Sequence, residues 1–271
     1  MNLFGDVDAP GPIERTFVGT SGYSFQDWVG PFYPHGTPRG KMFDYYVRHF
    51  PCVEINATYY RILPPSVMAQ IGEKAPEGYP FIVKAHKSLT HDRDESEDHI
   101  GAWIQSVQPL VERNQMAGVL AQFPYSFKLS QNSLDYIART RERLSDYSYF
   151  AEFRHVGWMR PDVFNFLREN RIEFVSVDEP PLQGLLPPTP VMTGDTLYVR
   201  FHGRNTEHWW GGGGDRYDYR YSKAELTEWL TKLKKLRERA GTTFLFFNNC
   251  HKGQATGNAQ TMLALLEGGS T

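Results

Sequence analysis

The chain has 271 residues, of which 40% are hydrophobic and 22% are charged. These shares are close to those of soluble globular domains, so a sizeable core can be buried and disorder is not expected. The formal net charge of −2 excludes a strong overall attraction to nucleic acid or anionic lipid. No apolar segment approaches the ~18 residues of a membrane span, and the N-terminus lacks a secretion signal pattern, so we expect a cytoplasmic protein with no membrane partner.

The first 15 residues contain Gly, Pro and Asp without periodicity, which predicts a flexible tail before a single domain at 16–271. From residue 16, short apolar segments alternate with helical patterns, as in a parallel sheet with crossover helices. Strands are predicted near 16–21, 53–57, 81–86, 117–122, 148–154, 173–178, 196–202 and 243–249. Helices are predicted near 41–49, 65–75, 97–114, 130–144, 161–171, 222–240 and 255–267.

Eight strand and crossover units over about 250 residues favour a TIM (β/α)8 barrel over an open doubly wound sheet. The crossover between the sixth and seventh strands is unusual, because residues 179–195 contain five prolines. Such a density prevents a regular helix, so a loop is expected there. In the helix at 222–240, Ser222 and Glu225 have the spacing of a capping box, and an apolar stripe predicts packing on the sheet.

Two cysteines are present, Cys52 before the second predicted strand and Cys250 after the eighth. In a barrel these positions lie at opposite ends of the sheet, too far apart for a disulfide. Both are therefore expected to be free thiols.

Polar residues interrupt the predicted strands in a regular way. Side chains two residues apart in a strand point to the same face, and five strands carry polar pairs with this spacing near their C-terminal ends. The pairs are Glu54 and Asn56, Lys84 and His86, Glu152 and Arg154, Ser176 and Asp178, and Arg200 and His202. The other strands end with Ser21, Gln122, and Asn248 or Asn249. Active sites of barrels are built at this end, so a ligand-binding mouth is predicted, with a self-neutralising buried ion network as the alternative.

Long aromatic loops follow several strands. The loop at 21–34 contains Tyr23, and another follows the third strand at 87–95. The loop at 203–222 contains Trp209 and Tyr219, and its glycines at 211–214 suggest a mobile lid with stacking side chains.

The segment 248–259 brings Lys252, Gly253 and Gly257 to the start of the last predicted helix. Many barrels bind phosphate there through backbone N–H groups, and Arg204 could assist from the neighbouring loop. An anion site at this position is therefore a hypothesis.

Eight segments in order resemble the YecE-like family, a domain of unknown function. They are GTSGYSFQDWVGPFYP, VEINATYYR, FIVKAHKSLTH, QFP, EFRHVGW, VRFHGR, YDYRYS and FFNNCHKGQATGNA, spanning Thr16 to about Leu266. The resemblance implies a TIM barrel and supplies no reaction.

Three functions follow as hypotheses. The first is an enzyme, a hydrolase, lyase or isomerase, acting on a phosphate-bearing small molecule or nucleotide, with no metal and no other cofactor. In it the candidate catalytic groups are Glu54, His86, Glu152, Asp178 and His202, and the candidate ligand-binding groups are Ser21, Tyr23, Asn56, Lys84, Gln122, Arg154, Arg200, Arg204, Trp209, Tyr219, Asn248, Asn249 and Lys252.

The second hypothesis is a metal-dependent hydrolase or isomerase of the apurinic endonuclease or xylose isomerase type, in which the acids and histidines bind the metal. The third is a non-catalytic module for single-stranded nucleic acid, with Trp209, Trp210, Tyr217, Tyr219 and Tyr221 as stacking platforms. The acidic balance of the chain does not favour it.

Overall fold

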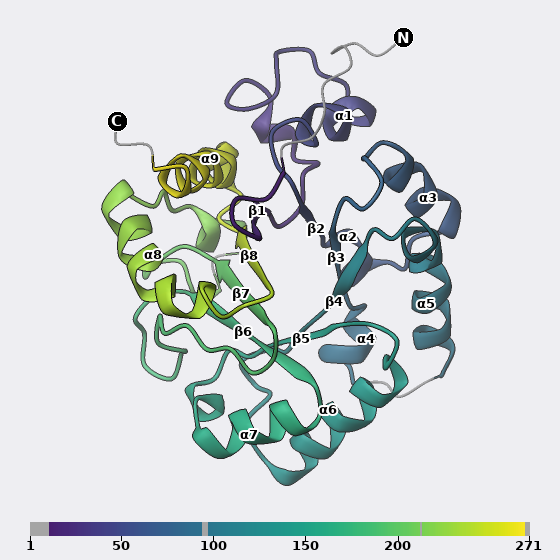
Figure 1. Cartoon of the computed structure of the whole chain (residues 1–271), viewed down its shortest axis with the longest axis vertical. Helices are drawn as coiled ribbons and strands as arrows, with labels where there is room; N and C mark the ends of the chain where they lie inside the picture. Colours follow the sequence, from purple (N-terminus) through teal and green to yellow (C-terminus); the bar gives the residue numbers. More distant parts are fainter. Residues whose placement is uncertain (1–10, 94–96, 212, 269–271) are drawn as a thin grey trace.

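A computed structural model describes residues 11–93, 97–211 and 213–268. Its eight parallel strands form one sheet in the order β1-β8-β7-β6-β5-β4-β3-β2, and Figure 1 shows them as a ring with helices outside. The edge strands β1 and β2 meet at one bridge, Ser21 with Glu54, where the Gly22 N–H donates to the Glu54 carbonyl at 2.8 Å. The sheet is therefore a nearly closed TIM barrel, as the sequence predicts.

All eight predicted strands are present. Their bounds are β1 Thr16–Thr20, β2 Val53–Ile55, β3 Phe81–Lys84, β4 Met116–Gln122, β5 Tyr149–Glu152, β6 Ile172–Asp178, β7 Thr196–Phe201 and β8 Thr242–Phe247. Most of the tail predicted at 1–15 lies outside the described residues, but Ile13 pairs with Thr16 next to β1.

The seven predicted helices are present, six of them shorter than predicted and the last shifted by one residue. The α-helices are α1 Met42–Tyr46, α2 Ala57–Tyr60, α3 Pro65–Glu73, α4 Lys87–Thr90, α5 Glu97–Glu112, α6 Gln131–Arg143, α7 Pro161–Glu169, α8 Lys223–Arg237 and α9 Gln254–Leu266. The short 3-10 helices are η1 Gln26–Trp28, η2 Arg39–Lys41, η3 Val156–Trp158, η4 Gly213–Tyr217 and η5 His251–Gly253. The helices α2 and α4 were not expected, because each is a single turn that directly follows a strand. None of the helices in the described part of the chain is both long enough and apolar enough to cross a membrane.

The crossover from β6 to β7 contains no helix, as its prolines predict. It packs against β6 instead, where the Val191 N–H donates to Ser176 Oγ at 2.9 Å. Helix α8 begins with the predicted capping box, in which the Ser222 N–H donates to Glu225 Oε2 at 2.8 Å. Its buried Trp229 packs edge-on against Phe201 of β7, so α8 covers the sheet.

Apolar side chains fill the lumen at the N-terminal ends of the strands. This inner cluster is separate from the larger core between sheet and helices, and consists of Cys52, Ile82, Leu120, Phe150, Val175, Tyr198, Phe244 and Phe246. Cys52 and Cys250 are both free thiols, as expected. Since side chains alternate along a strand, the inner cluster fixes which later residues face the mouth.

Candidate functional site

A buried ion network lies directly above the inner apolar cluster. Arg200 Nη2 donates to Glu54 Oε1 at 2.6 Å, and its Nε donates to Oε2 at 2.8 Å. Arg200 Nη1 donates to Glu152 Oε2 at 2.5 Å, and the Tyr198 hydroxyl donates to Glu54 Oε2 at 2.5 Å. Ser21 Oγ accepts from Arg200 Nη2 at 3.2 Å. Residues of β2, β5, β7 and the end of β1 thus meet in the lumen, as predicted. These side chains are closed to solvent, however, and so resemble the buried ion network that was the alternative to a ligand-binding mouth.

The network continues upward through Arg154. Its Nη2 lies 2.6 Å from Glu152 Oε1, and its Nη1 donates to Glu179 Oε2 at 3.0 Å. Burial opposes ionisation of Glu152, but Arg154 and Arg200 outweigh it and hold the pKa of this carboxyl well below its usual range. Burial raises the pKa of Glu179 to about 7, although Arg154 opposes the shift.

His202 lies fully buried at the edge of this network. Its Nε2 is 3.2 Å from Glu152 Oε1, and its Nδ1 is 2.9 Å from Asn248 Nδ2. Burial first, and then the charge of Arg154, lower the pKa of His202 to about 3. The ring is therefore neutral at neutral pH, and its fully buried position between Glu152 and Asn248 does not support a proton-carrying role.

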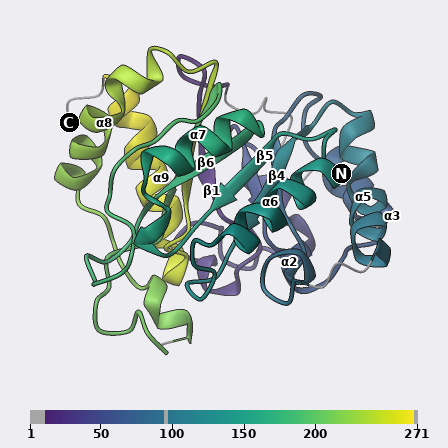
Figure 2. The same ribbon diagram turned by 90° about the horizontal axis from the view of Figure 1, so that it is seen from below.

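Above the network a cavity of about 230 Å³ opens at the mouth. It is lined by the cations Lys84, Arg154 and Arg216, by the aromatic residues Tyr59, Tyr60, Tyr125, Trp209, Trp210 and Tyr217, and by His91, Gln122, Pro124 and Leu185. Figure 2 shows the segment after β7, in light green, projecting beyond one end of the barrel, and this segment supplies Trp209, Trp210, Arg216 and Tyr217. Among the predicted lid glycines, Gly212 lies outside the described residues.

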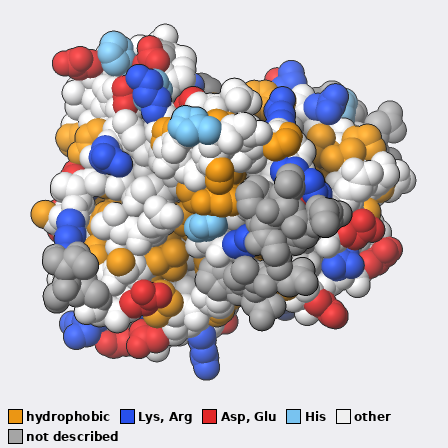
Figure 3. Space-filling view, turned by 90° about the horizontal axis from the view of Figure 1, so that it is seen from above, with side chains coloured by type: hydrophobic (Ala, Val, Ile, Leu, Met, Phe, Trp, Pro, Cys, Tyr) orange, Lys and Arg blue, Asp and Glu red, His pale blue; other side chains and the backbone are white. Residues whose placement is uncertain are grey.

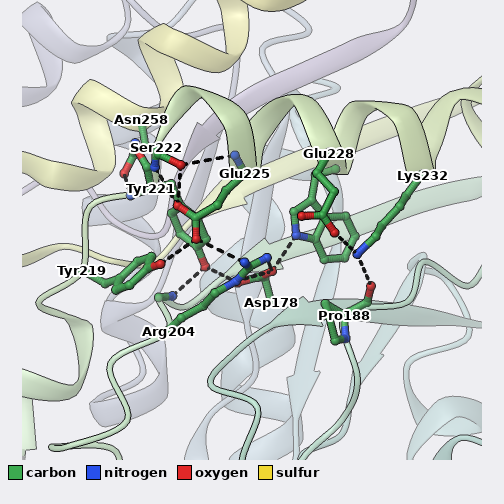
Figure 4. Close-up of polar contacts among 12 residues, drawn as sticks. Asp178, Pro188, Arg204, Tyr219, Tyr221, Ser222, Glu225, Glu228, Lys232 and Asn258 are labelled. Atoms are coloured by element: carbon green, nitrogen blue, oxygen red, sulfur yellow. Dashed lines mark hydrogen bonds and ion pairs between the residues drawn. The ribbon is translucent and has the colours of Figure 1, made fainter.

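The expected orientation of β6 is wrong. Val175 belongs to the inner cluster, so Ser176 and Asp178 point outward and Glu179 faces the mouth. Asp178 accepts from Arg204 Nη2 at 2.7 Å, from the Tyr221 hydroxyl at 2.7 Å and from Trp229 Nε1 at 2.5 Å. Figure 4 shows this carboxylate beneath α8, where it joins the helix to the sheet.

Two further candidates belong to the same outer network. Arg204 Nη1 donates to Glu225 Oε1 at 3.1 Å, and Tyr219 donates its hydroxyl to the same oxygen at 2.6 Å (Figure 4). Asn249 also points outward, since its Nδ2 donates to Asn258 of α9 at 2.8 Å. The structure therefore separates these residues from the mouth cavity.

Three other candidates, His86, Tyr23 and Asn56, do not line the cavity. His86 accepts from Ser88 at the start of α4 and stacks on His99, while His91 from the same loop reaches the cavity. Tyr23 packs against Phe43. Asn56 follows β2, and its Oδ1 is buried without a hydrogen-bond partner among the described residues.

The anion site predicted at the start of α9 already holds a carboxylate of the chain. The backbone N–H of Lys252 donates to Asp27 Oδ2 of η1 at 2.7 Å. Gly253 lies against Pro31, where an added Cβ would come within 3.0 Å of the ring. The loop after β1 thus covers Lys252 and Gly253, and a phosphate bound by the Lys252 N–H would have to displace Asp27, so the geometry does not favour an anion site there.

The metal hypothesis has no matching ligand set. In the described parts of the chain, no three side chains of His, Cys, Asp or Glu lie close enough together to hold a metal ion. Glu54 and Glu152, two of the proposed ligands, are ion-paired with Arg200 instead. The arrangement of residues therefore does not favour a divalent ion in the lumen.

The nucleic-acid hypothesis needs a continuous aromatic platform on a basic surface. Tyr221 is buried and its hydroxyl donates a hydrogen bond to Asp178, so the five predicted aromatic residues do not form one platform. Figure 3 shows one side of the barrel, where acidic and basic side chains are interspersed. The burial of Tyr221 does not favour a strand of nucleic acid at the mouth.

The fold and the cavity define a TIM-barrel protein with a cation-lined, aromatic mouth. A family model described as "Protein of unknown function DUF72" matches residues 17–270, and the chain belongs to this family. UPF0759 protein YunF of Bacillus subtilis is 31% identical over 269 residues, which cover 93% of this chain and 94% of YunF. The family resemblance read from the eight segments is thereby confirmed at the level of a family of unknown function.

Two solved structures share the whole fold. A DUF72 family protein of Thermotoga maritima is 39% identical with a TM-score of 0.85, over 93% of this chain and 99% of that chain. A DUF72 family protein of Enterococcus faecalis is 26% identical with a TM-score of 0.83, over 93% and 95% of the two chains. Both are similar along nearly their entire lengths, in agreement with the barrel described above.

Proposed function

We propose that the chain is an enzyme that acts on a phosphate-bearing small molecule bound in the mouth cavity. The observation that supports this proposal is the meeting of Arg154 and Arg216, with Lys84 beside them, around one cavity whose described lining contains no carboxylate. The acids of the ion network lie beneath it, since Glu54 and Glu152 are fully buried. An anion entering the mouth would therefore meet cations first.

The two arginines suit phosphate because a planar guanidinium can donate two parallel hydrogen bonds to its oxygens. Arg154 is held in place by Glu152 and Glu179 and lies 5.8 Å from the Trp209 ring. Arg216 comes from η4 and is exposed. One guanidinium is thus fixed from below, and the other approaches from the loop.

The aromatic walls supply the second half of the site. Ligand pockets commonly combine apolar walls with a few placed polar groups. Trp210 is 56% exposed and packs edge-on against Tyr125 at 5.0 Å, so a large apolar side chain stands at the rim. These walls favour a phosphate-bearing ligand with a face that can stack on aromatic rings, such as a sugar or a base.

Groups that can move a proton reach the same cavity. Burial first, and then the charge of Lys84, lower the pKa of His91 to about 4, so its ring is neutral at neutral pH. Its position makes it a better proton acceptor for a bound ligand than the predicted His86, which stacks on His99. An enzyme site therefore has its acid–base groups on β3 and in the loop that follows it.

The test is isothermal titration calorimetry with ribose 5-phosphate and AMP, and with ribose and adenosine as matched ligands without phosphate. We expect binding of the phosphorylated compounds only, and a loss of about tenfold in affinity in Arg216→Gln because one charge-assisted contact is removed. Arg239→Gln, an exposed arginine after α8, is the control and should bind like the wild type. Equal binding of ribose and ribose 5-phosphate, or no effect of Arg216→Gln, would contradict the proposal.

A further inference from the structure

Lys84 differs from the buried cations Arg154 and Arg200 in its partners. It is the last residue of β3 and lines the cavity. Its Nζ donates to Gln122 Oε1 at 2.8 Å and lies 4.4 Å from the centre of the Tyr59 ring. Within the described residues it forms no ion pair with a carboxylate, whereas Arg154 and Arg200 each contact two.

This arrangement favours the neutral amine. Burial first, and then the charge of Arg200, lower the pKa of Lys84 to about 7, against the opposing effect of Glu152 and Glu54. A desolvated lysine beside other cations is a recurrent way to make an amine nucleophilic at neutral pH. Glu54 and Glu152 pair with the arginines, and no ion pair between either acid and Lys84 is found among the described residues.

We propose that Lys84 is a nucleophile that forms an imine with an aldehyde or ketone group of the ligand, an inference that rests on the proposed phosphate-binding function. The substrate class is then a small carbonyl compound that carries a phosphate group. The phosphate lies toward Arg154 and Arg216, and the carbonyl carbon lies at Lys84 Nζ.

The chemistry balances within the two partners. The lone pair of neutral Nζ attacks the carbonyl carbon, the C=O π electrons move to oxygen, and one proton passes from nitrogen to that oxygen. The resulting carbinolamine loses water, formed from its hydroxyl and the second proton of the nitrogen, as the nitrogen lone pair closes the C=N bond. The imine withdraws electrons from the neighbouring carbon, which prepares a proton or a carbon–carbon bond there for cleavage.

Neighbouring groups fit this step. The Gln122 amide is fixed because its Nε2 donates to the Phe123 carbonyl at 2.9 Å, so Oε1 remains directed at Lys84. The His91 ring lies 4.9 Å from the Tyr59 ring and shares the cavity with Lys84. Gln122 thus positions the amine, and neutral His91 can take up a proton released from it.

The experiment uses pyridoxal 5′-phosphate, which carries an aldehyde and a phosphate, with unphosphorylated pyridoxal as its match. The full chain is incubated with each aldehyde, reduced with borohydride, digested and mapped by mass spectrometry. Because a large share of its amine is neutral at neutral pH and it sits beside a phosphate site, Lys84 should be labelled by the phosphorylated aldehyde at least about tenfold faster than exposed Lys87. Inorganic phosphate should slow this labelling, and Lys84→Arg should abolish it at position 84 while Lys87→Arg leaves it unchanged.

The outcomes separate this inference from the proposed function. Labelling of Lys84 no faster than Lys87, in a protein that binds ribose 5-phosphate in the calorimeter, overturns the imine and leaves the phosphate site standing. Fast labelling of Lys84 by both aldehydes alike supports the nucleophile and counts against the phosphate site. Slow labelling together with no phosphate binding overturns both.

Discussion

Arg200 and Glu54 face each other across the lumen in a bidentate contact, with two N–H groups of the guanidinium donating to the two carboxylate oxygens at 2.6 and 2.8 Å. Both side chains are almost fully buried. A buried pair is costly to break, because the remaining charge has neither water nor a partner. Glu54→Ala should therefore lower the free energy of unfolding by about 3 kcal/mol, measured by urea denaturation.

The loss of stability should depend on the burial of the ion pair. The exposed pair of Arg160 and Asp162 provides the comparison. Asp162→Asn should leave the urea midpoint unchanged, since exposed ion pairs contribute little. Tyr198→Phe removes only one hydrogen bond to Glu54 and should cost about 1 kcal/mol. A Glu54→Ala protein as stable as Asp162→Asn would show that the lumen network does not support the fold.

The neighbours Asp178 and Glu179 should separate stability from ligand binding. Asp178 fixes α8 through Arg204, Tyr221 and Trp229, so Asp178→Ala should lower the free energy of unfolding by about 3 kcal/mol. Glu179 holds Arg154 from below the cavity, so Glu179→Gln should weaken ribose 5-phosphate binding measured by calorimetry. A Glu179→Gln protein with unchanged affinity, or an Asp178→Ala protein with unchanged stability, would contradict this assignment.

The same two residues show where sequence reasoning reaches its limit. Strand positions, the barrel and the missing crossover helix follow from apolar periodicity and from proline chemistry, which are local properties. The adjacent acids at 178 and 179 place one carboxyl on each face of β6, so only the phase of the strand decides which one enters the mouth. That phase is set by Val175 packing in the lumen, a tertiary contact.

Arg216, a loop residue of the cavity, was missed for a related reason, whereas Trp209, Trp210 and Tyr217 of the same loop were among the predicted stacking residues. Arg216 and Tyr217 reach the cavity because the Asn205 side chain donates to the Asp215 and Asp218 carbonyls at 3.1 and 3.2 Å and so folds the loop after β7. In the sequence, the aromatic and glycine content of this loop indicated a binding segment, but not which side chains turn inward. The contact of Asp27 with Lys252 likewise joins residues far apart in the chain, and no local pattern revealed it.

Buried His202 should make the protein sensitive to mild acid. Its folded-state pKa is lowered to about 3, from an ordinary value of 6.5, so the unfolded chain binds the proton first as the pH falls. Stability from this group is complete above about pH 6.5 and is lost as the pH falls toward 3. The loss should reach about 2 kcal/mol between about pH 7 and pH 5.

Urea denaturation at a series of pH values tests this prediction. His202→Gln should flatten this part of the stability profile, and His208→Gln, at an exposed position, should not. Identical profiles for wild type and His202→Gln would contradict the prediction.

Gly184 should control the shape of the cavity from outside its lining. Its φ of +86° is disfavoured for other residues, and an added Cβ would collide with the hydroxyl of Tyr125, which lines the cavity. Gly184→Ala should therefore cost about 1–2 kcal/mol of stability and push Tyr125 toward Trp210, which weakens ribose 5-phosphate binding. Gly184→Ala combined with Tyr125→Phe separates the two causes, because removing the hydroxyl relieves the collision but not the backbone strain. The double variant is expected to recover affinity for ribose 5-phosphate but not the urea midpoint. A Gly184→Ala protein with wild-type affinity would contradict the role of Tyr125 in ligand binding.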